Sequence, residues 1–221
     1  MSLQLSPQQA AAELLARRRA RTSLLDFTRY TNPAYVAASH HERIAAKLEA
    51  VERGEIDRLM ITMPPRHGKS ELASRRFPSW YLGRNPSQPI IAASYNSELA
   101  GDFGREVRNI VASPEYHAIF PVTLAADSQA ANRWHTSDGG QYVAAGVGTA
   151  ITGRGAKILL IDDPFKDRQE ADSEINRKRV WDWYTSTAYT RLMPGGEIII
   201  MNTRWHDEGL YGGRMEEQKN G

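Results

Sequence analysis

A chain of 221 residues can form one large domain or two small ones, and at this size about 70% of the surface exposed by the unfolded chain can be buried. Its 28 basic and 26 acidic side chains nearly cancel, so the net charge gives no argument for a nucleic-acid partner. The absence of cysteine excludes disulfide bonds and thiolate chemistry, and no apolar run approaches the length of a membrane span. We therefore expect a soluble intracellular protein.

Two helical patterns occupy the first 55 residues. Residues 7–21 form a short amphipathic pattern with a basic end, which is either a solvated helix face or a contact with a partner or DNA. Residues 40–51 carry aliphatic side chains at helical spacing, and Gly54 is expected to end that helix. We expect residues 1–55 to be a helical segment packed on a core formed by residues 56–221.

Four apolar runs are predicted to be strands, at about 58–63, 89–94, 157–161 and 197–202. Helical patterns lie between them, around 69–82, 97–112 and 172–190. Strands that alternate with helices at these intervals predict an α/β fold, with a parallel sheet sandwiched between helices on both faces. Pro78 falls inside the first of these helices and is expected to kink or end it.

A different pattern follows between residues 134 and 155. Asp138-Gly139-Gly140 separates two short segments of mixed polarity, which predicts a hairpin. Four glycines then fall between residues 146 and 155, and they predict a mobile loop ahead of the third strand.

The pentapeptide Arg66-His67-Gly68-Lys69-Ser70 follows directly on the first predicted strand. It is the ending of the pattern G-x-x-x-x-G-K-[ST], in which backbone N–H groups cradle phosphates, the lysine reaches the β- and γ-phosphates and the hydroxyl binds Mg²⁺. Met63 replaces the first glycine, and Pro64 and Pro65 stiffen the loop, so its shape must be fixed differently. Pro65 and the pentapeptide are the predicted nucleotide-binding residues, and Ser70 is also a predicted Mg²⁺ ligand.

The third predicted strand runs into two carboxylates, Asp162 and Asp163. In nucleotide-hydrolysing proteins with a phosphate loop, the first acid holds Mg²⁺ through its water shell and the second polarises the attacking water. A core strand that ends in an Asp-Pro turn is the simpler interpretation of this segment alone. Because a Gly-Lys-Ser follows another apolar strand, we favour an ATP-hydrolysing site, with Asp162 at Mg²⁺ and Asp163 as the catalytic residue.

Four blocks of sequence together resemble the large terminase subunit of tailed bacteriophages. They are Met63–Ser70, Ile151–Gly155, Leu160–Pro164 and Pro194–His206. The resemblance runs from about residue 24 to the C-terminus and implies a P-loop NTPase fold of the RecA/ASCE-like type. It also implies a motor that hydrolyses ATP, with Mg²⁺, to drive double-stranded DNA into a procapsid.

Partners and location are implied by the same resemblance. The expected partners are double-stranded DNA, a portal protein and a small terminase subunit, with self-association into a ring on the portal and a monomer in isolation. The expected location is the cytoplasm of an infected bacterial host, without a membrane contact. The resemblance further implies a C-terminal nuclease domain that this chain lacks, so no nuclease activity is expected from it.

Positive charge on the transition state accelerates phosphoryl transfer, so arginines near the site are candidates for catalysis. Arg66 lies inside the loop and could act in cis, whereas Arg154 lies between two glycines and in similar terminases can project into the neighbouring subunit's site. Arg204 is a third candidate, and a surface arginine is the alternative for each. Asn202 and Thr203 follow the last strand and are expected to sense the γ-phosphate, although an ordinary turn is the alternative.

Two aromatic residues and one histidine pair are further candidates for the site. Phe27 and Tyr35 are either adenine-stacking residues or core residues. His40-His41 suggests a metal site, but adjacent histidines are expected to point apart and no third ligand is spaced to join them.

Two other functions remain open at this level. One is a helicase-like motor of the same fold, and the other is a nucleotide-gated binding module with little turnover. Steady-state phosphate release separates the binding module from both motors.

Overall fold

The computed structural model describes residues 6–151 and 153–203. In this part of the chain seven strands form one sheet, in the order β1-β7-β6-β2-β5-β4-β3. The strands are β1 (Arg58–Thr62), β2 (Pro89–Ser94), β3 (Leu124–Ala130), β4 (Arg133–Thr136), β5 (Gln141–Gly146), β6 (Ala156–Asp162) and β7 (Leu192–Asn202).

Five of the strands, from β1 to β5 in sheet order, are parallel. The four strands predicted from apolar runs are β1, β2, β6 and β7, and all four predictions are confirmed. The hairpin is also confirmed, because β4 pairs with β5 in antiparallel orientation around Asp138-Gly139-Gly140. The remaining strand, β3, pairs in antiparallel orientation with β4 and was not predicted. Its sequence, LAADSQA, has neither β-branched residues nor regular alternation.

Helical elements connect the strands. The α-helices are α1 (Pro7–Thr22), α2 (Leu24–Thr31), α3 (Ser39–Glu52), α4 (Phe77–Arg84), α5 (Ser97–Val111), α6 (Pro114–Ile119), α7 (Arg168–Asp172) and α8 (Glu174–Trp183). Two π-helical turns, η1 (Glu71–Arg76) and η2 (Tyr184–Ala188), and the 3₁₀ turn η3 (Tyr189–Arg191) complete the set. No helix in the described part of the chain is long and apolar enough to cross a membrane.

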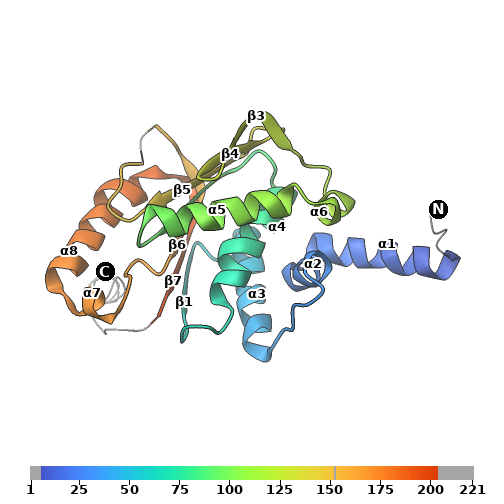
Figure 1. Cartoon of the computed structure of the whole chain (residues 1–221), viewed down its shortest axis with the longest axis horizontal. Coiled ribbons are helices and arrows are strands. Elements are labelled where there is room, and N and C mark those ends of the chain that lie inside the picture. The colour runs from blue at the N-terminus through green and yellow to red at the C-terminus, as the bar shows by residue number, and fades with distance from the viewer. Residues whose placement is uncertain (1–5, 152, 204–221) are drawn as a thin grey trace.

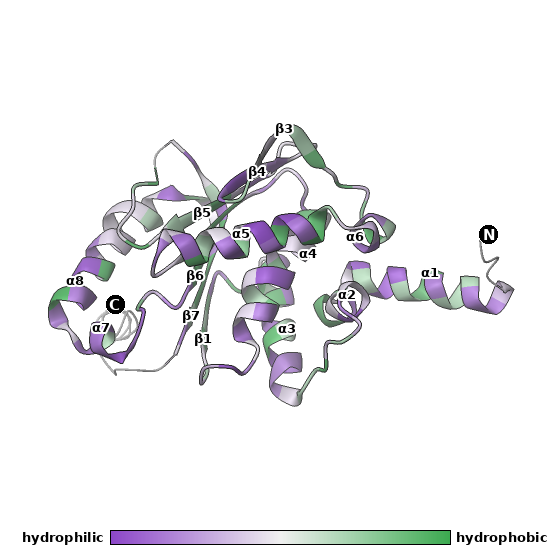
Figure 2. Ribbon diagram, viewed as in Figure 1, coloured by the Kyte–Doolittle hydropathy of each residue, from purple (hydrophilic) through white to green (hydrophobic). Residues whose placement is uncertain are grey.

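Helices cover both faces of the sheet (Figure 1). Along β6, Ile158 and Leu160 join a core with α2 to α6, whereas Leu159 and Ile161 join a second core with α7, α8 and η2. This alternation follows from the two-residue repeat of a strand, and a parallel sheet buried on both faces needs apolar side chains at every position. Figure 2 accordingly shows the central strands as mostly hydrophobic and the helices as striped. The predicted α/β fold with helices on both faces is confirmed.

The first three helices differ in how deeply they pack. Leu24 of α2 and Leu48 of α3 are fully buried in the first core. In contrast, α1 extends away from the sheet (Figure 1), and its Leu14 and Leu15 are 66% and 54% exposed. Gly54 ends α3 as predicted, with a φ of 72° and an N–H that donates to the Val51 carbonyl at 2.9 Å. The division at residue 55 itself stays a prediction.

The helix that follows β1 does not end at Pro78, contrary to one of the two outcomes expected for this residue. Pro78 neither ends this helix nor lies at its end, because helical structure runs from Lys69 to Arg84. The wide π-helical turn η1 ends at Arg76, two residues before Pro78, and such a turn relieves the backbone clash that a proline causes in an α-helix. The Ser79 hydroxyl also donates to the Arg75 carbonyl at 2.8 Å. A carbonyl oxygen within the π-helical turn therefore has a hydrogen-bond donor.

Candidate nucleotide-binding site

Three segments that are distant in sequence meet at the carboxyl ends of neighbouring strands. Because β7 lies between β1 and β6, the residues that follow these strands share one edge of the sheet. The 63–70 loop follows β1, Asp162 ends β6, and Thr203 follows β7. The structure therefore brings the predicted loop, acids and polar strand end together.

Lys69 is the centre of this site. Its side chain is only 6% exposed, and its Nζ atom forms an ion pair with Asp163. The same Nζ lies 3.8 Å from Asp162 Oδ1 and donates to Thr203 Oγ1 at 3.3 Å. A buried ammonium group needs such partners, because desolvation of an isolated charge costs several kcal/mol.

Asp163 reaches Lys69 because the backbone turns sharply after β6. Successive residues of a strand face opposite sides, but Asp163 has a φ of 44°, in the left-handed region that aspartate tolerates better than most residues. Its N–H donates to the Met201 carbonyl at 3.0 Å, and its Oδ1 accepts from the Thr203 N–H at 2.9 Å. Both carboxylates therefore face the Lys69 ammonium group.

Asp162 is more deeply enclosed. It is 1% exposed, and its Oδ2 accepts from the Ser74 hydroxyl at 2.6 Å. Burial raises the pKa of the Asp162 carboxyl, whereas the hydrogen bonds from Ser74 and Ser70 act in the opposite direction. Asp162 Oδ1 is buried and has no hydrogen-bond partner among the described residues.

The chemistry around Asp162 fits a divalent cation. Mg²⁺ prefers oxygen ligands and often retains several of its waters. Asp162 offers a buried oxygen with a free lone pair, and the Ser70 hydroxyl contacts the same carboxylate. The predicted Mg²⁺ ligands Ser70 and Asp162 therefore lie together.

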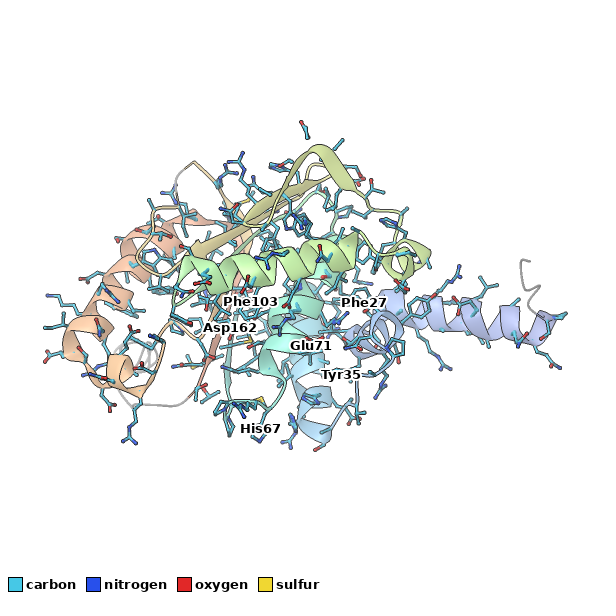
Figure 3. The ribbon with its side chains drawn as sticks, in the orientation of Figure 1. Phe27, Tyr35, His67, Glu71, Phe103 and Asp162 are labelled. Carbon is cyan, nitrogen blue, oxygen red and sulfur yellow. The ribbon has the colours of Figure 1, made fainter. Side chains whose placement is uncertain are left out.

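Left-handed backbone shapes the 63–70 loop. Arg66 and Gly68 have φ values of 63° and 76°, and His67 Nδ1 lies 2.8 Å from the Pro65 carbonyl oxygen. The side chains of Pro65, Arg66 and His67 are exposed. Figure 3 shows His67 at the lower end of the molecule and Asp162 farther up, against the sheet. The loop thus presents exposed side chains to solvent directly before the buried Lys69.

Comparison with protein families matches residues 60–219 to the N-terminal part of the terminase large subunit, T4likevirus type. The chain belongs to this family. The crystal structure of the HK97 bacteriophage large terminase is similar, with a TM-score of 0.58, 13% sequence identity and coverage of 84% of this chain. This terminase chain covers 37% of that longer one, and at such low identity the likeness concerns the fold alone. No curated protein matches the sequence.

The two described arginine candidates lie apart from Lys69's contacts. Arg66 is exposed, and Arg154 is half-buried in the wall of a cavity of about 310 Å³, together with Ser97 and Thr149. Neither arginine forms an ion pair with any residue that the structure describes. Arg204 lies outside the described residues.

Other predicted residues differ in their surroundings. Asn202 is 4% exposed, and its Oδ1 has no hydrogen-bond partner within the described part of the terminase chain. Phe27 is completely buried, with its ring centroid 6.1 Å from that of Tyr116, so it is a core residue. Tyr35 is half-buried, and its ring centroid lies 5.5 Å from that of His41.

The expectation that His40 and His41 point apart is wrong. Their Nε2 atoms lie 3.0 Å from each other, and both approach the His67 carbonyl oxygen, His41 at 3.0 Å and His40 at 3.2 Å. The pair begins α3, and both rings turn toward the 63–70 loop. Among residues 6–151 and 153–203, no group of three acidic, histidine or cysteine side chains is placed to hold a metal ion.

The sequence analysis did not identify Ser74, nor the contact between this histidine pair and the 63–70 loop. A signal for Ser74 was available, because residues four apart on a helix share a face and Ser74 follows Ser70 by four. No comparable signal pointed from His41 to the loop, because their contact depends on how α3 packs beside β1.

Proposed function

We propose that this terminase chain is the ATP-hydrolysing part of a motor that moves double-stranded DNA into a procapsid. The observation that carries the proposal is the buried Lys69 ammonium group, held between Asp162 and Asp163 where three strands end. The family match and the terminase-like fold support the DNA-packaging role.

Triphosphate binding follows from where Lys69 lies. It begins a helix, where the positive end of the helix dipole disfavours a cation unless an anion binds there. The phosphates of ATP would supply that anion, through contacts with Lys69 and with the backbone N–H groups of Gly68 and Ser70. Pro65, Arg66 and His67 would form the exposed wall of this phosphate site.

Ser70 and Asp162 would hold the Mg²⁺ ion. When bound, Mg²⁺ neutralises negative charge on the phosphate oxygens. Ser74 holds Asp162 Oδ2 at 2.6 Å, which leaves Oδ1 free to accept a hydrogen bond from a metal-bound water.

Asp163 would be the general base. A triphosphate that binds Lys69 competes for the ammonium group that Asp163 now contacts, while the Thr203 N–H continues to orient the carboxylate. The carboxylate takes a proton from a water whose oxygen attacks the γ-phosphorus. The bond from this phosphorus to the bridging oxygen of the β-phosphate breaks, and ADP leaves.

Thr203 contacts both Lys69 and Asp163, at the end of the strand next to β1. We assign to Asn202 and Thr203 the sensing of the γ-phosphate, because loss of this group changes the partners of Lys69 and Asp163 together. Arg66 and Arg154 are the two candidates for the arginine that stabilises transition-state charge, in cis and in trans respectively.

The proposal includes the assembly that such a motor needs. Portal protein, small terminase subunit and DNA are its partners, and subunits form a ring on the portal while the isolated chain is a monomer. This assembly works in the cytoplasm of an infected bacterial cell.

Two variants test the proposed site. Lys69→Ala removes the charge that binds phosphate, so its affinity for a fluorescent ATP analogue should fall at least about a hundredfold. Asp163→Asn should bind the analogue nearly as tightly as the wild type, but should hydrolyse ATP at least about a hundredfold more slowly. Equal loss of binding in both variants would refute the separate roles of these residues.

A further inference from the structure

The 63–70 loop has Met63 in place of the glycine that usually opens such a loop, so another feature must fix its shape. In the described structure, two histidine rings contact the loop at the His67 carbonyl oxygen. His41 Nε2 lies 3.0 Å from this oxygen, and His40 Nε2 lies 3.2 Å from it. Both rings come from the first turn of α3, a helix that precedes β1 in sequence.

The hydrogen bonds of His41 determine its tautomer. The Ala38 N–H donates to His41 Nδ1 at 3.0 Å, so this nitrogen carries a lone pair. In a neutral imidazole the proton then lies on Nε2, which makes Nε2 a donor that faces both the His67 carbonyl oxygen and His40 Nε2, each at 3.0 Å. His41 therefore links two backbone groups, the N-terminus of α3 and the 63–70 loop.

The ring of His41 also fits the loop sterically. A Cβ atom at Gly68 would lie 2.5 Å from His41 Nε2, closer than such contacts occur. Gly68 also has a φ of 76°, which disfavours any residue with a side chain. The ring thus occupies the space directly beside Gly68, which immediately precedes Lys69.

We propose that His41 is a positioning residue that sets the 63–70 loop in the shape that binds triphosphate. This inference rests on the proposed ATP binding. By holding the His67 carbonyl, His41 fixes the peptide that leads into Gly68 and orients the N–H groups at the start of the helix. Movement of α3 would consequently change the affinity of the site for nucleotide.

Two substitutions separate this role from helix capping. In His41→Gln the amide nitrogen stands near the position of Nε2, so the side chain can still donate to the loop but no longer caps α3. In His41→Asn the shorter side chain reaches the position of Nδ1, so it can still cap α3 but no longer reaches the loop. Lys47→Gln, at an exposed position of the same helix, is the control.

The measurement is titration with a fluorescent ATP analogue in Mg²⁺, together with thermal unfolding without nucleotide. We expect His41→Asn to weaken binding about tenfold with little change in unfolding temperature, because it loses one hydrogen bond to the loop. His41→Gln should show the reverse, a lower unfolding temperature with an affinity within about threefold of the wild type. The control should match the wild type in both measurements.

Wild-type affinity in His41→Asn would overturn the inference alone, whereas absence of binding by the wild type would overturn the proposed function and the inference with it. If His41→Asn does not fold, nitrogen NMR of the wild-type imidazoles decides instead. A neutral His41 protonated at Nε2, with a signal that shifts on nucleotide binding, supports the inference. Protonation at Nδ1 contradicts it.

Discussion

The Ser74 hydroxyl determines which oxygen of the Asp162 carboxylate stays free. Ser74 donates to Oδ2 from the π-helical turn η1, and Oδ1 has no partner among the described residues. π-Helical turns are frequent at functional sites because they change the direction in which side chains point. At this position the turn places a hydroxyl where it orients a buried acid.

Ser74→Ala should therefore weaken Mg²⁺ binding without affecting the phosphate contacts of Lys69. We expect the Mg²⁺ concentration for half-maximal binding of a fluorescent ATP analogue to rise roughly tenfold, because a hydrogen bond to a charged group contributes about 1.5–3 kcal/mol. Binding of the analogue in EDTA should stay unchanged. Ser74→Thr keeps the hydroxyl and should resemble the wild type.

Ser79→Ala is the matched control for this prediction. Ser79 is fully buried in the same helical segment, but it donates to the Arg75 carbonyl and not to Asp162. An equal change of Mg²⁺ dependence in Ser74→Ala and Ser79→Ala would show that the effect is a general loosening of the helix.

At the scale of the residue, sequence reasoning located the groups that belong to short motifs. Lys69, Asp162 and Asp163 were predicted because the motif specifies both residue type and local element, and the structure brings the three side chains together. His41 could not be found in this way, because its contact with the loop depends on how α3 packs, whereas Ser74 had a signal in its spacing of four residues from Ser70. The positive φ of Asp163, which lets both acids face Lys69, likewise depends on hydrogen bonds with β7 and Thr203.

At the scale of the element, α1 and α2 differ in how deeply their leucine side chains are buried, and their sequences do not predict this difference. Both contain leucine pairs, but Leu14 and Leu15 of α1 are more than half exposed whereas Leu24 of α2 is completely buried. The pattern over residues 7–21 predicted α1, whereas no pattern predicted α2, and only packing in the folded core decides that Leu24 is buried while Leu14 and Leu15 are not.

This contrast gives a stability prediction. The double variant Leu14→Ala/Leu15→Ala should change the free energy of unfolding by no more than about 0.5 kcal/mol, as expected for exposed positions. Leu24→Ala should reduce it by about 2–5 kcal/mol, because it leaves a cavity in the core. Urea denaturation followed by circular dichroism measures both, and a loss above about 1 kcal/mol in the α1 variant would contradict the exposed position of these leucines.

Elements were predictable where the apolar repeat was strong. The four predicted strands have continuous apolar runs, and β6 shows the reason most clearly, because the side chains of its sequence AKILLID are buried on both faces of the sheet. The polar edge strand β3 and the turn η1 have no such pattern. Pro78 was expected to kink or end its helix, because sequence alone does not reveal a π-helical turn ahead of it.

At the scale of the whole molecule, Arg154 bears on how subunits would cooperate. It lies in the wall of a separate cavity and has no ion-pair partner among the described residues. If it acts in trans, a mixture of Arg154→Ala and Lys69→Ala proteins should recover ATPase activity, although each is nearly inactive alone. The Arg154→Ala protein supplies an intact nucleotide site, and the Lys69→Ala protein supplies the arginine.

In that mixture the recovered rate should rise more than linearly with protein concentration, because activity requires association. Sedimentation of the wild type under the same conditions is the control for association. If the wild type associates and the mixture stays inactive, Arg66 acting in cis becomes the better candidate.

Steady-state release of phosphate from ATP is the measurement that tests the proposed ATP hydrolysis most directly. The wild-type chain should release phosphate in Mg²⁺ and stop when EDTA is added, and Asp163→Asn should bind the ATP analogue yet release phosphate at least about a hundredfold more slowly. Wild-type chain that binds nucleotide without turnover, or Asp163→Asn protein with the wild-type rate, would contradict the account.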